Sequence, residues 1–325
     1  MSTATTGMVS LLGLDPATYV PHAIHTPGER TYTETNCYSD ILIELVHARG
    51  DEPLAAAGFT VRMDFEGDQW TFFKPPPEDL ERLFGIDIHE MQPYRPLPQQ
   101  IAEQIVDGRT IIVELDSWYL PDTASTSYRN EHVKTSVIAE AIDHDAERLV
   151  YFHNTSLHAL DGEDYRGVFR LGREFSPDVL PPYTELVRFD DGPRLRGDEL
   201  RAAARELLHG HLARRPQTNP FERFGAQLAA TLPDLLAGDA ATYHDYAFAT
   251  VRMYGSAFEI TASHVDWLLG DEGAAASAAL TRIVEGSKVL SLRLARRREF
   301  DPQPYAEAAA EAWEEAMTEL EAAVG

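Results

Sequence analysis

The spacing of apolar residues predicts the first helix of the chain near residue 37. Ile41, Leu42, Leu45 and Val46 recur at intervals of three and four residues, which puts them on one helical face that runs from about 37 to 48. Gly50 ends this helix, and shorter helical patterns follow at 78–84 and 98–106.

Segments rich in β-branched residues predict strands around these helices. The run 110–116 has the composition of a central strand, and 136–142 with 149–152 forms a predicted hairpin around a polar turn. Shorter strands are predicted at 59–63, 70–74 and 86–89. The first half therefore has an α+β pattern with a largely antiparallel sheet.

The second half of the chain has a different composition. Beyond Asp198, alanine, leucine and glutamate dominate between proline and glycine breaks, which predicts four to six helices, the last at 305–324. The change near Pro181-Pro182 divides the chain into an α+β domain, 1–185, and an all-α domain, 186–325. We expect the helical domain to cover the cleft of the first domain.

Composition narrows the classes of function. The formal net charge is −25, from 28 basic and 53 acidic residues, which argues against broad electrostatic capture of nucleic acid or of an anionic membrane. Cys37 is the one cysteine, so no intrachain disulfide can form, as is typical of a reducing cytoplasm. The sequence shows no signal-peptide pattern, no apolar run of about 18 residues, and no metal-binding or glycine-rich phosphate motif. We therefore expect a cytoplasmic protein that needs no metal and no cofactor.

Cys37 stands in the first turn of the first predicted helix, where a nucleophile is useful because a helix N-terminus favours the reactive thiolate. His132 precedes the apolar run 137–142, and Asn154 follows the strand 149–152. A cysteine at a helix start, then a histidine and an amide on later strands, is the chain order of papain-type triads. In such triads the three residues act as nucleophile, base and orienter of the base.

Other assignments stay open at these positions. Asp143 is a second candidate to orient His132, and Asn36 could add to an oxyanion hole beside the backbone N–H of the cysteine. His153 is the weaker base because it points to the opposite face of its strand from Asn154. A lone cysteine is also commonly a buried small hydrophobe, and an asparagine can simply end a strand in a turn.

Two further groups are candidates for substrate binding. The first follows a buried strand, suits an aromatic wall beside a cleft, and comprises Asp116, Trp118 and Tyr119. The second lies on otherwise apolar helices of the second half and comprises Arg252, Glu259 and Lys288. Charges in such positions are costly unless paired, so these three either hold a polar acceptor in the cleft or form an ion-pair network between helices.

Four segments resemble a known bacterial family. They read TNCYSD (35–40), DFEGDQWTFFK (64–74), ELDSWYLPD (114–122) and EHVKT (131–135). Together they resemble the family catalogued as domain of unknown function 1839, over most of the chain. More distantly, the first half is similar in plan to the N-terminal domain of the butirosin-type acyltransferase. That enzyme class has a papain-like fold and moves an aminoacyl group from an acyl carrier protein thioester to an amine through a cysteine.

The resemblance implies a papain-like core of helix and antiparallel sheet, followed by an all-α domain. It implies that Cys37 is the nucleophile, that His132 is the base, and that Asn154 approximately matches the orienter. Peptidases that process bacteriocin leaders share this core, but the glutamine that usually precedes their cysteine is not evident in this chain. This difference favours transfer over proteolysis.

The expected function is a cysteine-dependent acyl or aminoacyl transferase that passes its acyl group from a carrier-protein thioester to a small-molecule amine in a biosynthetic pathway. The alternatives are a papain-like cysteine peptidase or amidase, a transferase that takes its acyl group from aminoacyl-tRNA, and a non-catalytic binding protein on a degenerate papain-like core. An acidic carrier protein would need a basic docking surface, for which the candidates are Arg214-Arg215 and the arginines at 293–298.

Overall fold

The computed structural model describes residues 7–26, 28, 30–172 and 180–325. The chain forms two compact units, neither of them continuous in sequence. Unit 1 comprises Met1–Thr26, Asn36–Pro53 and Leu80–Arg194. Unit 2 comprises Pro27–Thr35, Leu54–Asp79 and Leu195–Gly325. Two early segments therefore belong to the helical unit, a division that a single cut at residue 185 does not describe.

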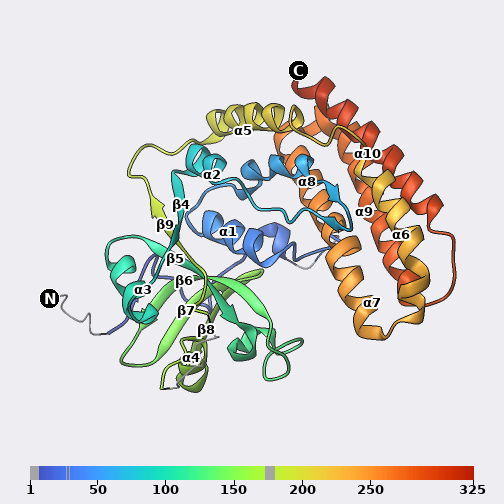
Figure 1. Cartoon of the computed structure of the whole chain (residues 1–325). Coiled ribbons are helices and arrows are strands. Elements are labelled where there is room, and N and C mark those ends of the chain that lie inside the picture. The colour runs from blue at the N-terminus through green and yellow to red at the C-terminus, as the bar shows by residue number, and fades with distance from the viewer. Residues whose placement is uncertain (1–6, 27, 29, 173–179) are drawn as a thin grey trace. The chain divides into compact units, whose positions relative to one another are not determined.

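Unit 1 is built on an antiparallel sheet of seven strands (Figure 1). The strand order is β4, β9, β5, β6, β7 and β8, and β1 pairs with the far end of β6. The expected antiparallel sheet is confirmed, since every pairing in it is antiparallel. The strands are β1 (Val9–Ser10), β4 (Ile86–Met91), β5 (Thr110–Asp116), β6 (Lys134–Asp143), β7 (Arg148–His153), β8 (Ser156–Asp161) and β9 (Thr184–Phe189).

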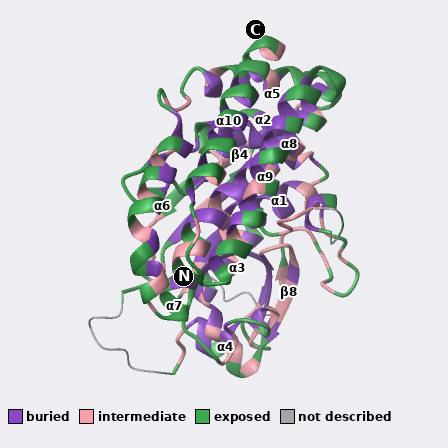
Figure 2. Cartoon of the chain, turned by 90° about the vertical axis from the view of Figure 1, so that its right-hand side faces the viewer, coloured by how far each residue is buried: buried purple, intermediate pink, exposed green. Residues whose placement is uncertain are grey.

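Helices cover both faces of this sheet. Helix α1 (Cys37–Ala48) begins and ends as the hydrophobic pattern predicts and packs on β6, β7 and β8. Buried residues follow most of its length, from Tyr38 to Val46 (Figure 2). Helix α3 (Leu97–Val106) contacts β1, β5 and β6, and α4 (Gly162–Val168) contacts β7 and β8. They share one apolar core with alternate strand residues, which include Ile111, Val113, Leu115, Val137 and Tyr151.

Unit 2 is mainly helical, and its six α-helices among residues 195–325 agree with the four to six expected. Helix α8 packs on α9, and α10 packs on α6 and α9. The helices are α5 (Gly197–Leu212), α6 (Pro220–Ala237), α7 (Ala240–Ala247), α8 (Met253–Leu269), α9 (Ala274–Ala295) and α10 (Gln303–Val324). A π-helical turn, η5 (Phe248–Arg252), joins α7 to α8, and α2 (Pro77–Phe84) spans the boundary between the units.

The segment 54–79 differs from the sequence-based expectation. The strand predicted at 59–63 is part of a 3₁₀ helix, η2 (Pro53–Arg62), and 70–74 retains only the edge of β3 (Gln69–Trp70), which pairs with β2 (Phe65–Glu66). Trp70 packs on the rings of Phe221 and Tyr254, 4.9 and 5.2 Å away. Packing against helices of unit 2 thus decides the conformation of this apolar segment.

A buried carboxylate fastens the N-terminal segment to β6. Glu140 falls at an irregularity in the pairing of β6 with β7 and is fully buried. Its oxygens accept hydrogen bonds from the backbone N–H groups of Leu11, Leu12 and Leu14 at 3.1, 3.2 and 2.9 Å. The hydroxyl of Ser10 donates at 3.0 Å. These donors replace the water that the carboxylate loses on burial.

We expect Glu140→Ala to lower the free energy of unfolding by about 3 kcal/mol, because the partly buried N–H groups of Leu12 and Leu14 would lose their acceptor and the N–H of Leu11 would keep only the backbone carbonyl of residue 140. Urea unfolding followed by circular dichroism measures this change. Glu163→Ala is the matched control, because it removes a carboxylate of the same kind from the surface. The Glu163 side chain is 71% exposed, and its contact with Arg129 is long, at 3.7 Å. Equal stability of the two variants would contradict the role of Glu140.

Candidate functional site

A pocket of about 430 Å³ opens in unit 1 where β5 ends and β6 begins. The two strands are antiparallel with Asp116 opposite Lys134, so the end of one strand lies beside the start of the other. The wall combines charged, aromatic and proline residues, which include Glu114, Asp116, Tyr119, His132, Lys134, Gly167, Arg170, Pro181, Pro182 and Tyr183. The sheet register therefore gathers polar groups around one concave surface.

Asp116 and His132 form a dyad in this pocket. Asp116 Oδ2 lies 2.6 Å from His132 Nδ1, and Asp116 Oδ1 accepts a hydrogen bond from the backbone N–H of Trp118 at 3.1 Å. The Trp118 ring stacks on the imidazole, with centroids 4.5 Å apart and planes 11° from parallel. The His132 side chain is 65% exposed, and its Nε2 has no partner among the described residues. The imidazole is thus held by a carboxylate and an indole, with one nitrogen open to a substrate or a nucleophile.

The rest of the wall is closely packed. Tyr119 lies against Gly167, where a Cβ atom would come within 2.2 Å of Tyr119 Cδ1, so this position needs glycine. Lys134 Nζ lies 2.7 Å from Glu114 Oε1, which pairs the two charges. Asp116 and Tyr119 line the pocket, and Trp118 stacks on His132. A role of these residues in substrate binding stays a prediction.

Cys37 is the first residue of α1 and is partly exposed. The Asn36 side chain caps the helix by accepting a hydrogen bond from the Ser39 N–H at 2.9 Å, which occupies its amide oxygen. Cys37 Sγ makes no hydrogen bond to His132 or to any other group in the described ranges. The start of the helix is as predicted, and the catalytic role of the cysteine stays a prediction.

A shared carboxylate joins the first turn of α1 to the pocket wall. Tyr38, next to Cys37 in the chain, donates to Glu185 Oε2 at 2.7 Å. Tyr183, which lines the pocket, donates to Glu185 Oε1 at 2.9 Å. Burial and the hydrogen bond to Glu185 raise the pKa of Tyr38, so its hydroxyl keeps its proton and remains a donor. The N-terminal end of α1 is therefore tied to the same wall that holds His132.

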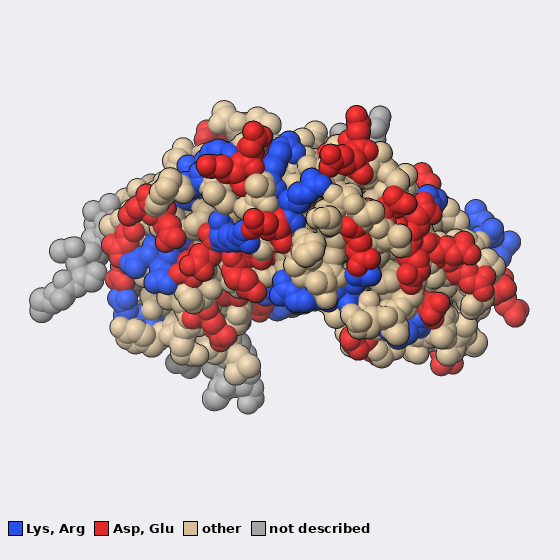
Figure 3. Space-filling view, turned by 90° about the horizontal axis from the view of Figure 1, so that it is seen from above, with Lys and Arg blue, Asp and Glu red and all other residues tan. Residues whose placement is uncertain are grey.

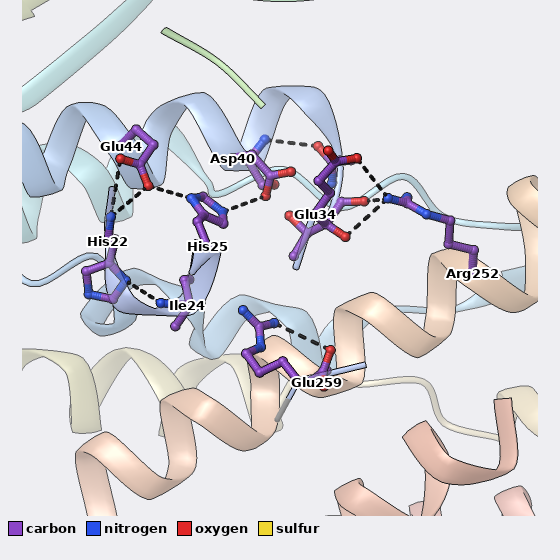
Figure 4. A network of polar contacts seen from close by, with 12 residues as sticks. His22, Ile24, His25, Glu34, Asp40, Glu44, Arg252 and Glu259 are labelled. Carbon is purple, nitrogen blue, oxygen red and sulfur yellow. Dashed lines mark hydrogen bonds and ion pairs between the residues drawn. The ribbon is translucent and has the colours of Figure 1, made fainter. Parts of the chain in front are cut away.

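A buried histidine clamps α1 from the other side (Figure 4). His25, in the 3₁₀ helix η1 (Ala23–His25), lies between two carboxylates that are one turn apart on α1. Its Nδ1 is 2.5 Å from Glu44 Oε1 and its Nε2 is 3.2 Å from Asp40 Oδ1. Burial alone would lower the pKa of His25, but hydrogen bonds and attraction from the two carboxylates outweigh it and raise the pKa to about 9. His25 is therefore a cation at neutral pH.

Neither Asn154 nor Asp143 makes a hydrogen bond to His132 among the described residues. Asn154 lies in the turn between β7 and β8 with φ of +48°, a left-handed conformation that asparagine tolerates. Asp143 ends β6 and accepts a hydrogen bond from the Ala146 N–H at 2.9 Å, so it lies at the opposite end of the strand from His132. Asp116, rather than either of them, orients His132, because strand register and not chain order decides which carboxylate is near.

A second histidine–aspartate pair is buried beside β7. His153 Nδ1 lies 2.5 Å from Asp122 Oδ2, and its Nε2 is 2.8 Å from Thr135 Oγ1. Tyr151 also donates to Asp122, at 2.5 Å. Desolvation would raise the pKa of Asp122, but these hydrogen bonds and the nearby histidines lower it. The His153 ring is fully bonded and 1% exposed, so its role is structural.

Two of the charged residues singled out in the second half, Arg252 at the end of η5 and Glu259 on α8, hold a loop of unit 2. Glu259 accepts hydrogen bonds from the backbone N–H groups of Thr31 and Tyr32 at 2.6 and 2.7 Å. Arg252 donates to the carbonyl oxygens of Thr35 and Glu34 at 2.9 and 3.2 Å (Figure 4). Both side chains thus bond to the backbone of a loop, and a role in holding an acceptor stays a prediction.

The third residue of that group differs from the other two. Lys288 is exposed on α9 and has no partner in the part of the chain that the structure describes. Lys288 therefore lies on the surface of unit 2 and makes no hydrogen bond or ion pair with the described residues of the loop that Arg252 and Glu259 hold.

No group of three or more His, Cys, Asp or Glu side chains among the described residues is arranged to hold a metal ion. No helix in the described ranges combines the length and the apolar character that crossing a membrane requires.

The charge on His25 makes the stability of unit 1 depend on pH. A raised pKa means that the stabilisation is complete below about pH 6.5 and is lost as the pH rises through about 9. We expect the free energy of unfolding to fall between pH 7 and pH 10, and His25→Gln to remove about 3 kcal/mol at pH 7 and flatten this dependence. Urea titrations at several pH values measure both effects.

His89→Gln is the matched control for this prediction. His89 also faces a carboxylate, Asp87, at 2.6 Å, but its side chain is 59% exposed. A pH dependence that survives in His25→Gln and disappears in His89→Gln would contradict the assignment.

Comparison with protein families identifies the chain. Residues 20–189 match the DUF1839 N-terminal domain, and residues 197–322 match the DUF1839 C-terminal domain. A comparison with curated proteins finds no match. Because the matched segments cover most of the sequence and include both halves of the fold, the chain belongs to the DUF1839 family.

Proposed function

We propose that this protein is a cysteine-dependent acyl transferase that passes an acyl or aminoacyl group from a carrier-protein thioester to an amine. The observation that carries the proposal is the exposed Asp116–His132 dyad, 2.6 Å apart, with an open Nε2 in a pocket. A base that is fixed by a carboxylate is what a thiol nucleophile requires. Cys37 is the candidate nucleophile, because the next residue, Tyr38, bonds to Glu185. The same carboxylate accepts a hydrogen bond from Tyr183 of the pocket wall.

The proposed reaction has two steps. His132 Nε2 takes the thiol proton, Cys37 Sγ attacks the thioester carbonyl, the bond from that carbon to the carrier sulfur breaks, and the carrier leaves as a thiol with the proton from His132. An amine then attacks the Cys37 thioester. The C–S bond breaks, His132 takes the proton from the amine and the cysteine recovers it, which leaves an amide and the free enzyme. Asp116 holds the imidazole and stabilises its charged form.

The proposed relationship to papain-like enzymes rests on the arrangement of elements in unit 1. A buried helix with cysteine at its first position packs on an antiparallel sheet, and the histidine comes just before a strand of that sheet. In this proposal Asp116, from β5, replaces the amide of the papain-type triad. The first step requires Cys37 Sγ to come within hydrogen-bond distance of His132 Nε2, a contact that commonly tightens only when substrate binds.

A hydrolase is the second candidate function, and one observation favours it. The dyad has no bond to Cys37, so His132 could activate water instead and hydrolyse an amide or ester in the same pocket. The two candidates share the dyad and differ in whether the cysteine takes part.

We expect wild-type protein to gain the mass of one acyl group when it is incubated with a small N-acetylcysteamine thioester. Cys37→Ala should gain none, and because Cys37 is the one cysteine of the chain, intact-mass spectrometry reports on that thiol alone. Adding an amine should release the acyl group as an amide. An adduct that persists in Cys37→Ala would contradict the proposal.

His132→Gln should slow acylation of Cys37 by about 100-fold, and Asp116→Asn by about 10-fold, because the first removes the base and the second only its orienter. Single-turnover mass spectrometry at neutral pH gives the rates. His153→Gln is the matched control, since it removes a histidine from a buried pair, and it should acylate at the wild-type rate when folded. If His132→Gln abolishes amide hydrolysis while Cys37→Ala retains it, the hydrolase is the correct function.

A further inference from the structure

The last three turns of α9 carry a stripe of exposed basic and apolar side chains. It consists of Lys288, Val289, Leu292 and Arg293, together with Arg296, which follows the last residue of the helix, and we call it the α9 stripe. Lys288, Leu292 and Arg296 are spaced by four residues and therefore follow one line along the helix, with Val289 and Arg293 beside it. The buried residues of α9, such as Leu290 and Leu294, lie on a different side of the helix.

Both kinds of side chain in the α9 stripe are accessible to a partner. Leu292 is 57% exposed and Val289 is 45% exposed. None of the three cations has an ion-pair or hydrogen-bond partner in the described ranges. By contrast, Arg282, two turns earlier, pairs with Glu315 of α10. The nearest acidic residue along the same helix is Glu285, at the N-terminal end of the stripe.

The α9 stripe is an exception on an acidic protein. The chain has 53 acidic and 28 basic residues. On the face drawn in Figure 3, acidic and basic side chains are interspersed. Three neighbouring cations without acidic partners therefore form a local positive site. The eight steps from Lys288 to Arg296 cover roughly 12 Å along the helix axis. This length matches about two turns of a partner helix, whereas a nucleic-acid duplex or a membrane would present a longer charged surface.

We infer that the α9 stripe docks an acidic amphipathic helix of a partner protein, and that this partner is the carrier that delivers the thioester. The identity of the partner rests on the proposed function, whereas the chemistry of the surface does not. Acidic side chains of the partner pair with Lys288, Arg293 and Arg296, and its apolar residues cover Val289 and Leu292. The charges set the rate and orientation of encounter, and the apolar contacts slow dissociation.

The test measures binding directly, without catalysis. Fluorescently labelled bacterial acyl carrier proteins in their holo form are titrated with the full chain, and anisotropy gives Kd. We expect Arg296→Glu and Arg293→Glu each to raise Kd by about 10-fold or more, and Leu292→Ser to raise it by about 10-fold at unchanged charge. The matched control is Arg62→Glu, which makes the same charge change at an exposed arginine of η2.

The outcomes separate the docking surface from the chemistry. Variants of the stripe should still acylate Cys37 with the small thioester at the wild-type rate, while acylation from a carrier thioester slows. Carrier binding that depends on the stripe, together with no acylation of Cys37 by any donor, would refute the proposed function and leave the docking surface standing. Equal weakening by Arg62→Glu and Arg296→Glu, or no carrier binding by wild type, overturns the inference. The inference is also overturned if tRNA binds more tightly than the carrier protein and the stripe variants abolish that binding. A homodimer that Leu292→Ser dissociates overturns it as well.

Discussion

The structure of unit 1 depends on burying α1 together with its charges. Asp40 and Glu44 are fully buried on this helix, and two carboxylates in an apolar interior would oppose folding. His25 supplies the compensating positive charge between them, and Tyr19 and the backbone N–H of His22 add hydrogen bonds to Glu44. The same contacts fasten the N-terminal segment to the helix. Cys37 is the first residue of this helix. The position of Cys37 therefore depends on the charge that His25 supplies to Asp40 and Glu44.

Several histidines among the described residues lie close to an aspartate, and burial separates the roles of three of these pairs. His153–Asp122 and His211–Asp79 have side-chain exposures of 1% and 7%, and of 1% and 4%. A buried, fully bonded pair is inaccessible to substrate, so these two stabilise the fold. His132–Asp116 has exposures of 65% and 34% and lines a pocket. Hydrogen-bond geometry alone would not separate a structural pair from a candidate catalytic one.

The discontinuous division of the chain explains the charges on the helical half. Unit 2 includes two segments, 27–35 and 54–79, that come from the first quarter of the sequence. Backbone N–H groups of the first segment need acceptors, and Glu259 supplies them. The second segment supplies Trp70 to an aromatic cluster, where it packs against α6 and α8. Two charged residues that suggest a binding site in the sequence, Arg252 and Glu259, thus hold the first of these segments.

The sequence by itself determined the elements that have a strong local signal. Helix α1, strand β5 and the hairpin of β6 and β7 follow from periodicity and turn residues, because these features depend only on neighbours in the chain. The sequence also brought Cys37, His132 and the aromatic pair Trp118 and Tyr119 to notice. It missed β8, which pairs with its neighbour β7 across a two-residue turn, and β9, which is fixed by pairing with the distant strands β4 and β5.

Only the tertiary structure decided which groups meet. Asp116 orients His132 because β5 and β6 pair in one register, whereas Asn154, the candidate from chain order, lies in a turn. The cation between Asp40 and Glu44 comes from His25 in an irregular segment, which no periodic pattern connects to the helix. Contacts between residues far apart in the chain depend on strand register and on burial, and neither quantity is local to the sequence.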